Sequence, residues 1–279
     1  MHYHSGKMDK TTSILTAKQV TCGYGGKQVL FNIDLAVKVG EVLGVIGPNG
    51  SGKSTLLRVL SRVIVPMQGQ VTLNGQDLAG IRTEDLAKEI AVVSQHHPVT
   101  DMTVAEFVAL GRIPYHRRFQ FFEIKNDCDA VDRALSLTGT EKFRDRFLGA
   151  MSGGERQLVF VARALAQQPK ILLLDEPTTH LDITHQVMVL DLVRKLNREE
   201  EITVVMILHD LNLAGEYCER LLLLDEGRLC KIGPPAEVLT YQIIEQVYKT
   251  VVVVEKNPIS SKPCIFLVSE EERKRAHRV

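Results

Sequence analysis

A glycine-rich segment, GPNGSGKS, occupies residues 47–54. It fits the pattern G-x-x-x-x-G-K-[ST], in which glycines allow a tight loop whose backbone N–H groups point at phosphate oxygens. In this pattern Lys53 reaches the β and γ phosphates and the Ser54 hydroxyl coordinates Mg²⁺. An apolar run precedes the loop and a helical pattern follows it, as the motif requires. The sequence therefore predicts a nucleotide-phosphate site formed by Gly47, Pro48, Asn49, Gly50, Ser51, Gly52, Lys53, Ser54 and Thr55.

Two adjacent carboxylates, Asp175 and Glu176, follow a second apolar run at residues 171–174. A buried strand would deliver them to the carboxyl edge of a sheet, beside the glycine-rich loop. We expect Asp175 to hold Mg²⁺, through water, and Glu176 to accept the proton of an attacking water molecule. Two acids could also simply solvate the end of a strand. The loop upstream favours the catalytic interpretation.

The pentapeptide MSGGE, residues 151–155, precedes a helical pattern at 155–167. Ser152 and Glu155 have the spacing of a capping box, so the segment fits a well-capped helix. Two adjacent glycines, Gly153 and Gly154, are more than a cap needs. At a helix N-terminus they would also present bare N–H donors and the positive end of the helix dipole to an anion. Both interpretations remain open on the pentapeptide alone.

The remaining pattern predicts the elements that position these motifs. Residues 31–39 alternate apolar and polar, as in a half-buried antiparallel strand, and Asn74-Gly75 is a hairpin-turn signal. Continuous apolar runs are typical of parallel strands covered on both faces; they lie at 42–46, 171–174, 202–208 and 221–224. Helical patterns lie between the runs, at 55–63, 155–167 and 183–197. This order predicts an α/β fold, interrupted at about residues 99–150 by helical segments.

Composition excludes several classes of protein. The chain has 279 residues, 34 Lys+Arg, 34 Asp+Glu and 44% hydrophobic residues, which is typical of a globular protein and not of a disordered or coiled-coil one. The zero net charge gives no general attraction to nucleic acid. Five widely spaced cysteines form no CxxC pair, so we expect neither a disulfide framework nor a zinc site. No apolar run has the length of a membrane span, and the polar N-terminus lacks the pattern of a signal peptide.

Together the motifs resemble the nucleotide-binding subunits of the ATP-binding-cassette (ABC) family, from Tyr24 to His209 and on to about Val268. MSGGE is similar to the family signature LSGGQ, with Met151 for Leu and Glu155 for Gln. The resemblance implies a P-loop NTPase core with a mainly parallel sheet, an N-terminal antiparallel β subdomain and an inserted helical subdomain at about 99–158. It further implies one ABC ATPase domain at 14–268, flanked by a polar tail at 1–13 and a charged tail at 269–279.

Four further residues receive roles only through this resemblance. Tyr24 occupies the position of an aromatic ring that stacks on adenine, and Gln95 that of a glutamine that meets Mg²⁺ and senses a permease. Asp182 matches the loop that crosses to a partner subunit, and His209 the histidine that contacts the γ-phosphate. The other histidines considered are expected to be surface or loop residues without a role in catalysis: His96, His97, His116, His180 and His185.

The resemblance also implies how such a protein works. Two copies close head to tail, each ATP with its Mg²⁺ lying between one P-loop and the other copy's signature at Ser152, Gly153, Gly154 and Glu155. Closure would drive a separate membrane permease, supplied by a substrate-binding protein, from the cytoplasmic face of the membrane. The segments GRIPYH, DEPTTHLDITHQ, HDLNLA and KNPISSKP are similar to those of importers for iron-siderophore, haem and cobalamin.

Three alternatives stay open. One is a molybdate or tungstate importer of similar architecture, and another is a soluble ABC ATPase that acts as a switch in iron–sulfur cluster assembly. The third, a DNA-maintenance ATPase, is disfavoured by the neutral charge and the missing coiled coil. The sequence does not name the cargo, because the permease and the binding protein contact it.

Overall fold

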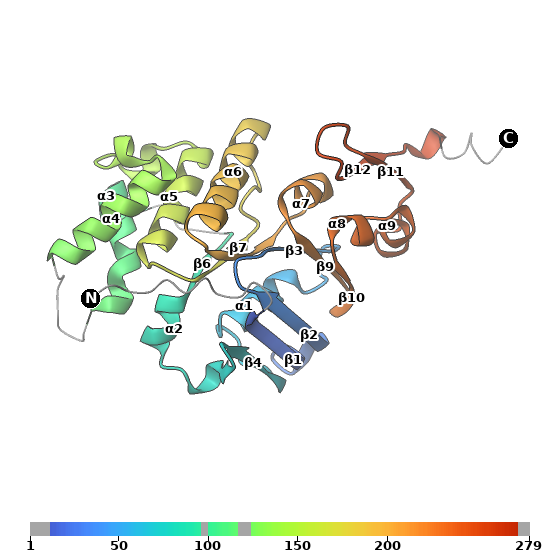
Figure 1. Ribbon diagram of the computed structural model, residues 1–279, viewed down its shortest axis with the longest axis horizontal. Helices are drawn as coiled ribbons and strands as arrows, with labels where there is room; N and C mark the ends of the chain where they lie inside the picture. Colours follow the sequence, from blue (N-terminus) through green and yellow to red (C-terminus); the bar gives the residue numbers. More distant parts are fainter. Residues whose placement is uncertain (1–11, 96–99, 117–123, 273–279) are drawn as a thin grey trace.

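The computed structural model describes residues 12–95, 100–116 and 124–272 (Figure 1). In chain order its elements are β1 (Ser13–Tyr24), β2 (Lys27–Lys38), β3 (Val42–Ile46), α1 (Lys53–Leu60), β4 (Gln68–Leu73), β5 (Gln76–Asp77), η1 (Leu78–Gly80), α2 (Thr83–Glu89), β6 (Ile90–Val93), α3 (Val104–Ala109), η2 (Leu110–Tyr115), α4 (Ile124–Thr138), η3 (Glu141–Phe143), η4 (Leu148–Ala150), α5 (Gly153–Ala166), β7 (Ile171–Asp175), α6 (Ile183–Glu199), β8 (Thr203–Ile207), α7 (Leu211–Tyr217), β9 (Arg220–Asp225), β10 (Arg228–Gly233), α8 (Pro235–Val238), α9 (Tyr241–Tyr248), β11 (Val252–Lys256) and β12 (Pro263–Leu267). Here η marks a 3₁₀ helix.

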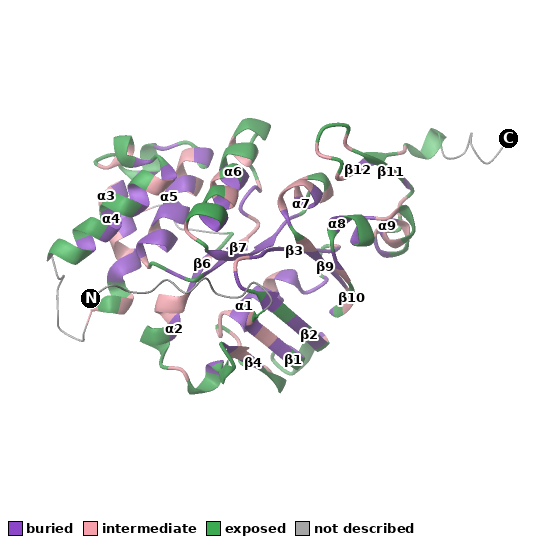
Figure 2. Ribbon diagram, viewed as in Figure 1, coloured by how far each residue is buried: buried purple, intermediate pink, exposed green. Residues whose placement is uncertain are grey.

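The central sheet has the strand order β10-β9-β3-β8-β7-β6. All neighbouring pairs are parallel except β10–β9, which is antiparallel. Figure 1 shows α5, α6 and α7 on one side of this sheet, and α1 with the N-terminal strands on the other. The apolar runs are therefore buried on both faces, as expected for parallel strands between two layers. Figure 2 shows the buried residues concentrated in these strands, with exposed residues on the outer faces of the helices.

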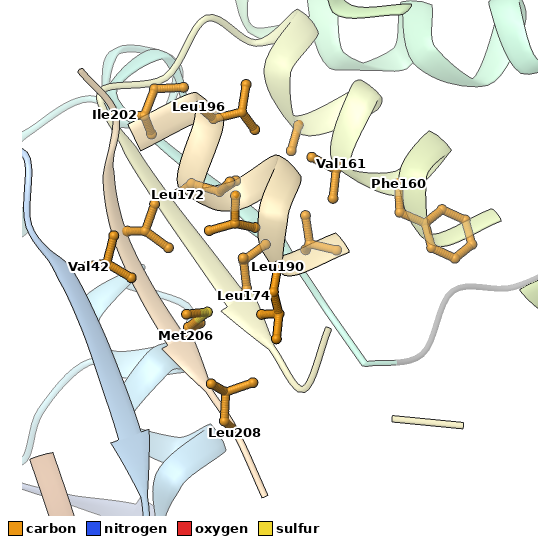
Figure 3. Packing of buried hydrophobic residues seen from close by; sticks show 14 of the residues in the cluster. Val42, Phe160, Val161, Leu172, Leu174, Leu190, Leu196, Ile202, Met206 and Leu208 are labelled. Carbon is orange, nitrogen blue, oxygen red and sulfur yellow. The ribbon is translucent and has the colours of Figure 1, made fainter. Parts of the chain in front are cut away.

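Alternate residues of each central strand enter different hydrophobic clusters. Leu172 and Leu174 of β7 pack in the cluster that includes Leu190 and Leu196 of α6, whereas Leu173 belongs to the cluster on the opposite face. Figure 3 shows Leu172, Leu174 and Met206 directed toward α6. The period of two along a strand thus divides one apolar run between two cores.

The N-terminal strands form a separate antiparallel sheet in the order β2-β1-β4-β5. Strand β1 pairs with β2 on one edge and with β4 on the other. The turn between β4 and β5 has φ of +50° at Asn74 and +81° at Gly75, conformations that Asn and Gly adopt most readily. Both the predicted antiparallel strand and the predicted hairpin turn are confirmed.

Helices α3, α4 and α5 form the inserted helical part. The aromatic rings of Phe107 in α3 and Phe160 in α5 lie edge to face, with centroids 5.6 Å apart. A buried ion pair joins Arg112 of η2 to Asp127 of α4 at 2.9 Å, and Arg112 also donates to the carbonyl oxygen of Ala166 at the end of α5. The expected helical insertion and the α/β fold class are confirmed.

Some elements have no counterpart in the sequence patterns used above. Strand β6 is the short apolar run IAVV, which was not assigned to a strand from the sequence, and half of the residues of β10 are exposed. The β11–β12 hairpin lies near the C-terminal end of the described chain (Figure 1). Of the proposed tails, residues 1–11 and 273–279 lie outside the described residues, so the predicted boundaries stay predictions. Among the residues that are described, no helix is long and apolar enough to cross a membrane.

The two-sided burial of β7 predicts a large difference between two leucine positions. Leu172→Ala removes a fully buried side chain from the central core, and we expect the free energy of unfolding to fall by about 2–5 kcal/mol. Leu267→Ala is the matched control, because the side chain of Leu267 is 85% exposed, and it should change that free energy by less than about 0.5 kcal/mol. Urea unfolding followed by circular dichroism measures both; equal losses would contradict this description of the core.

Candidate active site

The loop at residues 47–54 connects β3 to α1 in a conformation that depends on glycine. Gly47, Gly50 and Gly52 have φ of +147°, +79° and +97°. A Cβ at Gly47 would lie 2.1 Å from the carbonyl oxygen of Leu224, so a side chain has no room there. Around Gly50 nothing lies within 4 Å of the corresponding position. The loop is tightly packed on its inner side and open at Gly50, which fits the backbone cradle of a phosphate site.

Lys53, the first residue of α1, is buried beneath this loop. Its Nζ donates hydrogen bonds to the carbonyl oxygens of Gly47, at 2.9 Å, and Pro48, at 2.8 Å. Burial lowers the pKa of the ammonium group, and the nearby carboxylates of Glu176 and Asp175 oppose that effect. A cation held at this point by neutral carbonyl groups is placed to bind a phosphate oxygen.

Ser54 and Asp175 bring two oxygen ligands together. The Ser54 hydroxyl donates to Asp175 Oδ1 at 3.1 Å. Burial raises the pKa of Asp175, the Ser54 hydrogen bond acts in the opposite direction, and the charge of Glu176 raises it further. Among the described residues no group of three or more His, Cys, Asp or Glu could hold a metal ion. The pair instead fits Mg²⁺, which usually takes one or two protein ligands and keeps waters and phosphate oxygens.

Glu176 is held by side chains from three separate segments. Gln95 Nε2, after β6, donates to Glu176 Oε2 at 2.6 Å, and Thr179 Oγ1 donates to the same oxygen at 3.1 Å. His209 Nε2, after β8, lies 2.5 Å from Glu176 Oε1. Glu176 has φ of +55°, an uncommon conformation for a residue other than glycine that is often found at functional sites. The structure therefore brings Gln95, Glu176 and His209 together, while the roles predicted for them stay predictions.

Tyr24 lies at the end of β1 and is 44% exposed. Its hydroxyl lies 3.5 Å from Thr55 Oγ1 and accepts a hydrogen bond from Arg58 Nη1 at 3.0 Å. The ring is thus tied to α1, the helix that begins in the phosphate loop. An exposed aromatic ring at this point has the accessibility that stacking on a base requires.

The MSGGE segment forms a capping box at the start of α5, as predicted. Glu155 N–H donates to Ser152 Oγ at 3.3 Å, and Ser152 N–H donates to Glu155 Oε2 at 2.9 Å. This backbone hydrogen bond lowers the pKa of Glu155. Within the described residues no hydrogen bond or ion pair joins residues 152–155 to the loop at 47–54. Within the described part of the chain, the two predicted phosphate-binding segments therefore make no hydrogen bond or ion pair with each other.

Three residues near these segments were missed by the sequence analysis as parts of the site. Arg58 lies three residues after Thr55 on α1, a spacing that places both side chains on the same face. Thr179 follows Glu176 by three residues and its backbone N–H also donates to the Glu176 carbonyl oxygen, at 3.3 Å. His185 lies against Gly154 of the α5 N-terminus. The expectation for His96 and His97 falls outside the described residues.

Comparison with known proteins assigns the chain to a family. Residues 30–179 match the model of the ABC transporter family, and the chain belongs to that family. It is therefore an ABC ATPase.

Two curated relatives and one solved structure illustrate the similarity. The ferric enterobactin transport ATP-binding protein FepC of Escherichia coli is 39% identical, over 92% of this chain and 95% of its own length. The petrobactin import ATP-binding protein FpuC of Bacillus anthracis is 41% identical, over 84% and 86%. The dimeric structure of MJ0796, a bacterial ABC transporter cassette, has a TM-score of 0.70 and 31% identity, covering 79% of this chain and 98% of that one.

The raised pKa of Asp175 predicts a pH-dependent gain in stability for Asp175→Asn. In the folded protein without nucleotide, burial favours the neutral carboxyl group, so the destabilisation by ionised Asp175 grows as the pH rises from the ordinary aspartate pKa to the raised one and is fully present above it. Asn is neutral throughout, and we expect Asp175→Asn to raise the Tm at pH 7 in EDTA. The gain should shrink as the pH falls toward the ordinary pKa range of aspartate. Thermal unfolding across about pH 4–8 measures it, and a gain that grows as the pH falls would contradict the assigned cause.

Proposed function

We propose that this protein is the ATP-hydrolysing subunit of an importer and that Glu176 is its general base. The observation that carries the proposal is the position of Glu176, fixed by Gln95, Thr179 and His209 beside the loop that holds Lys53. A carboxylate fixed in this way can accept the proton of a water molecule whose oxygen attacks the γ-phosphorus, while ADP leaves. Lys53 and the loop N–H groups would stabilise the phosphate charge, and His209 would position the γ-phosphate.

Mg²⁺ fits the oxygen-rich corner of the same site. Ser54, Asp175 and Gln95 would hold it, with Asp175 acting through water. When bound, the ion would neutralise part of the phosphate charge. Gln95 now donates to Glu176, so a move of its side chain toward the ion would release one of the bonds that hold the base. Binding of Mg²⁺ would in this way change the hydrogen bonds of Gln95 and Glu176.

A second copy of the chain would complete each site. The signature residues Ser152, Gly153, Gly154 and Glu155 have no bond to their own phosphate loop, and the α5 N-terminus offers them as anion donors. The crossing-loop residue Asp182 caps α6 nearby. The related cassette MJ0796 has a dimeric structure, which supports a dimer of this chain as well. We therefore propose a head-to-tail homodimer with two ATP molecules between the copies.

A membrane permease is the proposed partner, bound at the cytoplasmic face of the membrane. A cavity of about 300 Å³ extends from Ser54 and Asp175 past Gln95 to Val63. Val63 is exposed, as are Val65 and Met67 after it. The exposed side chain of Val63, which lines the same cavity as Gln95, suits the docking of a permease segment, and Gln95 could respond to that contact. A substrate-binding protein would act indirectly, through the permease.

Iron-siderophore complexes are the proposed cargo. The names of the two relatives, which concern ferric enterobactin transport and petrobactin import, support this choice. Haem and cobalamin belong to the same proposed group of importers. Stimulation of ATP hydrolysis by ferric siderophore, in the complex of this chain with its permease and binding protein, tests the cargo. Stimulation by molybdate instead would contradict it.

Removal of the proposed base predicts a trapped dimer. Glu176→Gln keeps the size of the side chain but cannot accept the water's proton, so we expect the rate of ATP hydrolysis to fall by about 10²–10⁴-fold. ATP binding should persist, and size-exclusion chromatography with light scattering should show an ATP-dependent dimer. Lys53→Ala in the same background is the control, because without the ammonium it should bind little ATP and stay monomeric. A Glu176→Gln protein that binds ATP and remains a monomer would contradict the proposed dimer.

Docking through the apolar residues after α1 predicts that a charge there weakens the permease complex. We expect Val63→Asp to reduce the amount of polytopic permease that co-purifies from detergent-solubilised membranes. Ile259→Asp is the matched control, since Ile259 is 94% exposed in the turn between β11 and β12, and it should leave co-purification unchanged. Mass spectrometry of the purified complex measures both. Recovery of soluble scaffold proteins and no permease would favour the cytosolic-switch alternative.

A further inference from the structure

The second glycine of the signature is in close contact with a histidine of α6. Gly154 is buried, and a Cβ at this position would lie 2.0 Å from Cδ2 and 2.4 Å from Cγ of His185. Its φ is not in the left-handed region, so an alanine would fit the helix backbone itself. By contrast, a Cβ on Gly153 would have only Leu181 Cδ2 near it, at 3.8 Å. The His185 ring is therefore the steric reason for glycine at 154 within this chain.

The same histidine ring is bonded to the crossing loop. His185 Nδ1 lies 2.9 Å from both Oδ1 and Oδ2 of Asp182. Because a carboxylate only accepts, Nδ1 carries the proton of this bond. The backbone N–H of His185 also donates to Asp182 Oδ1, at 2.9 Å. The two hydrogen bonds from His185 hold the pKa of Asp182 below its usual range, so the carboxylate is ionised.

His185 thus links two segments that the proposed function assigns to the second copy's nucleotide. On one side it packs against the N-terminus of α5, which is fixed internally by its capping box. On the other side it binds Asp182, the N-cap of α6. The side chain is only about a third exposed (31%), which is low for a surface histidine on the first turn of a helix whose neighbours Ile183 and Thr184 are exposed. The expectation that His185 is a plain surface residue misses these contacts.

We propose that His185 is a positioning residue that holds the signature turn and the crossing loop together as one unit. In this role the side chain acts through its contacts with Gly154 and Asp182. Through Gly154 it sets the direction of the backbone donors at the start of α5, and through Asp182 it fixes the crossing loop at the same time. Both segments then meet the second copy in a fixed relative position. The inference rests on the proposed head-to-tail dimer.

Dimer affinity in the Glu176→Gln background tests this link. We expect His185→Ala to raise the Kd of the ATP-bound dimer about tenfold, from the loss of a hydrogen bond to a charged group, while ATP binding by the monomer stays the same. His185→Asn, whose amide can replace Nδ1 as donor, should recover part of the affinity. His185→Phe keeps a ring beside Gly154 and lacks the donor, so it should not. Thr184→Ala is the control on the same helical turn and should change the Kd by less than about twofold.

A double-mutant cycle tests the steric contact separately. Gly154→Ala should strongly weaken the dimer, because its methyl group displaces the His185 ring. Gly154→Ala combined with His185→Ala should be no weaker than His185→Ala alone, since the space left by the ring accepts the methyl group. Analytical ultracentrifugation with saturating ATP measures all of these variants.

The outcomes separate this inference from the function on which it rests. A Glu176→Gln parent that stays monomeric with ATP bound overturns the proposed dimer, and the role of His185 with it. A parent that dimerises with unchanged affinity after His185→Ala overturns only the positioning role. The positioning role is also overturned if Gly154→Ala raises the Kd of the dimer by the same factor in the presence of His185 and in the His185→Ala background. Gly154 would then act by direct contact with the second copy.

Discussion

Burial of opposite charges at the carboxyl edge of the central sheet is the interaction on which the site depends. Parallel strands β6, β7 and β8 end side by side, and the residues that follow them are Gln95, Glu176 and His209. Lys53 lies beneath the loop after β3, where burial lowers its pKa and the two carboxylates partly compensate. The two hydrophobic clusters on either face of the sheet hold these strand ends in place. If the strand ends were not held in place, the charged side chains would become solvated by water and would no longer lie close together.

The parts of this arrangement that the sequence predicts are those set by local chemistry. The glycine-rich loop, the capping box at Ser152 and Glu155, and the continuous apolar runs are local patterns, and the structure confirms the loop, helix start and strands that they predict. The missed parts depend on contacts between distant segments. Nothing near His185 in the sequence indicates that its ring meets Gly154, 31 residues earlier. Strand β6, the apolar run IAVV, was not assigned from the sequence, and its parallel pairing with β7 identifies it as a strand. The roles taken from the family resemblance remain predictions for each residue.

The phosphate loop and the signature turn of one chain are not bonded to each other, and this separation is the basis for the proposed dimer. Among the described residues the capped α5 N-terminus has no hydrogen bond to the phosphate loop of its own chain, so in the proposed dimer it would serve the nucleotide of the other copy. The link through His185 would keep that turn and Asp182 aligned while the copies separate and close. Gln95 lies between Glu176 and a cavity that reaches the exposed Val63, so hydrolysis and permease docking would share one side chain.

The most direct test of the central claim is a cross-link between the two halves of one composite site. One copy carries Asn49→Cys in the phosphate loop and the other Ser152→Cys at the signature turn, both at exposed positions, with the exposed Cys128 and Cys230 replaced by serine. The account predicts a disulfide between the two different variants that forms only when ATP and Mg²⁺ are present. Cross-links that form equally without ATP, or only between two copies of the Ser152→Cys variant, would contradict it.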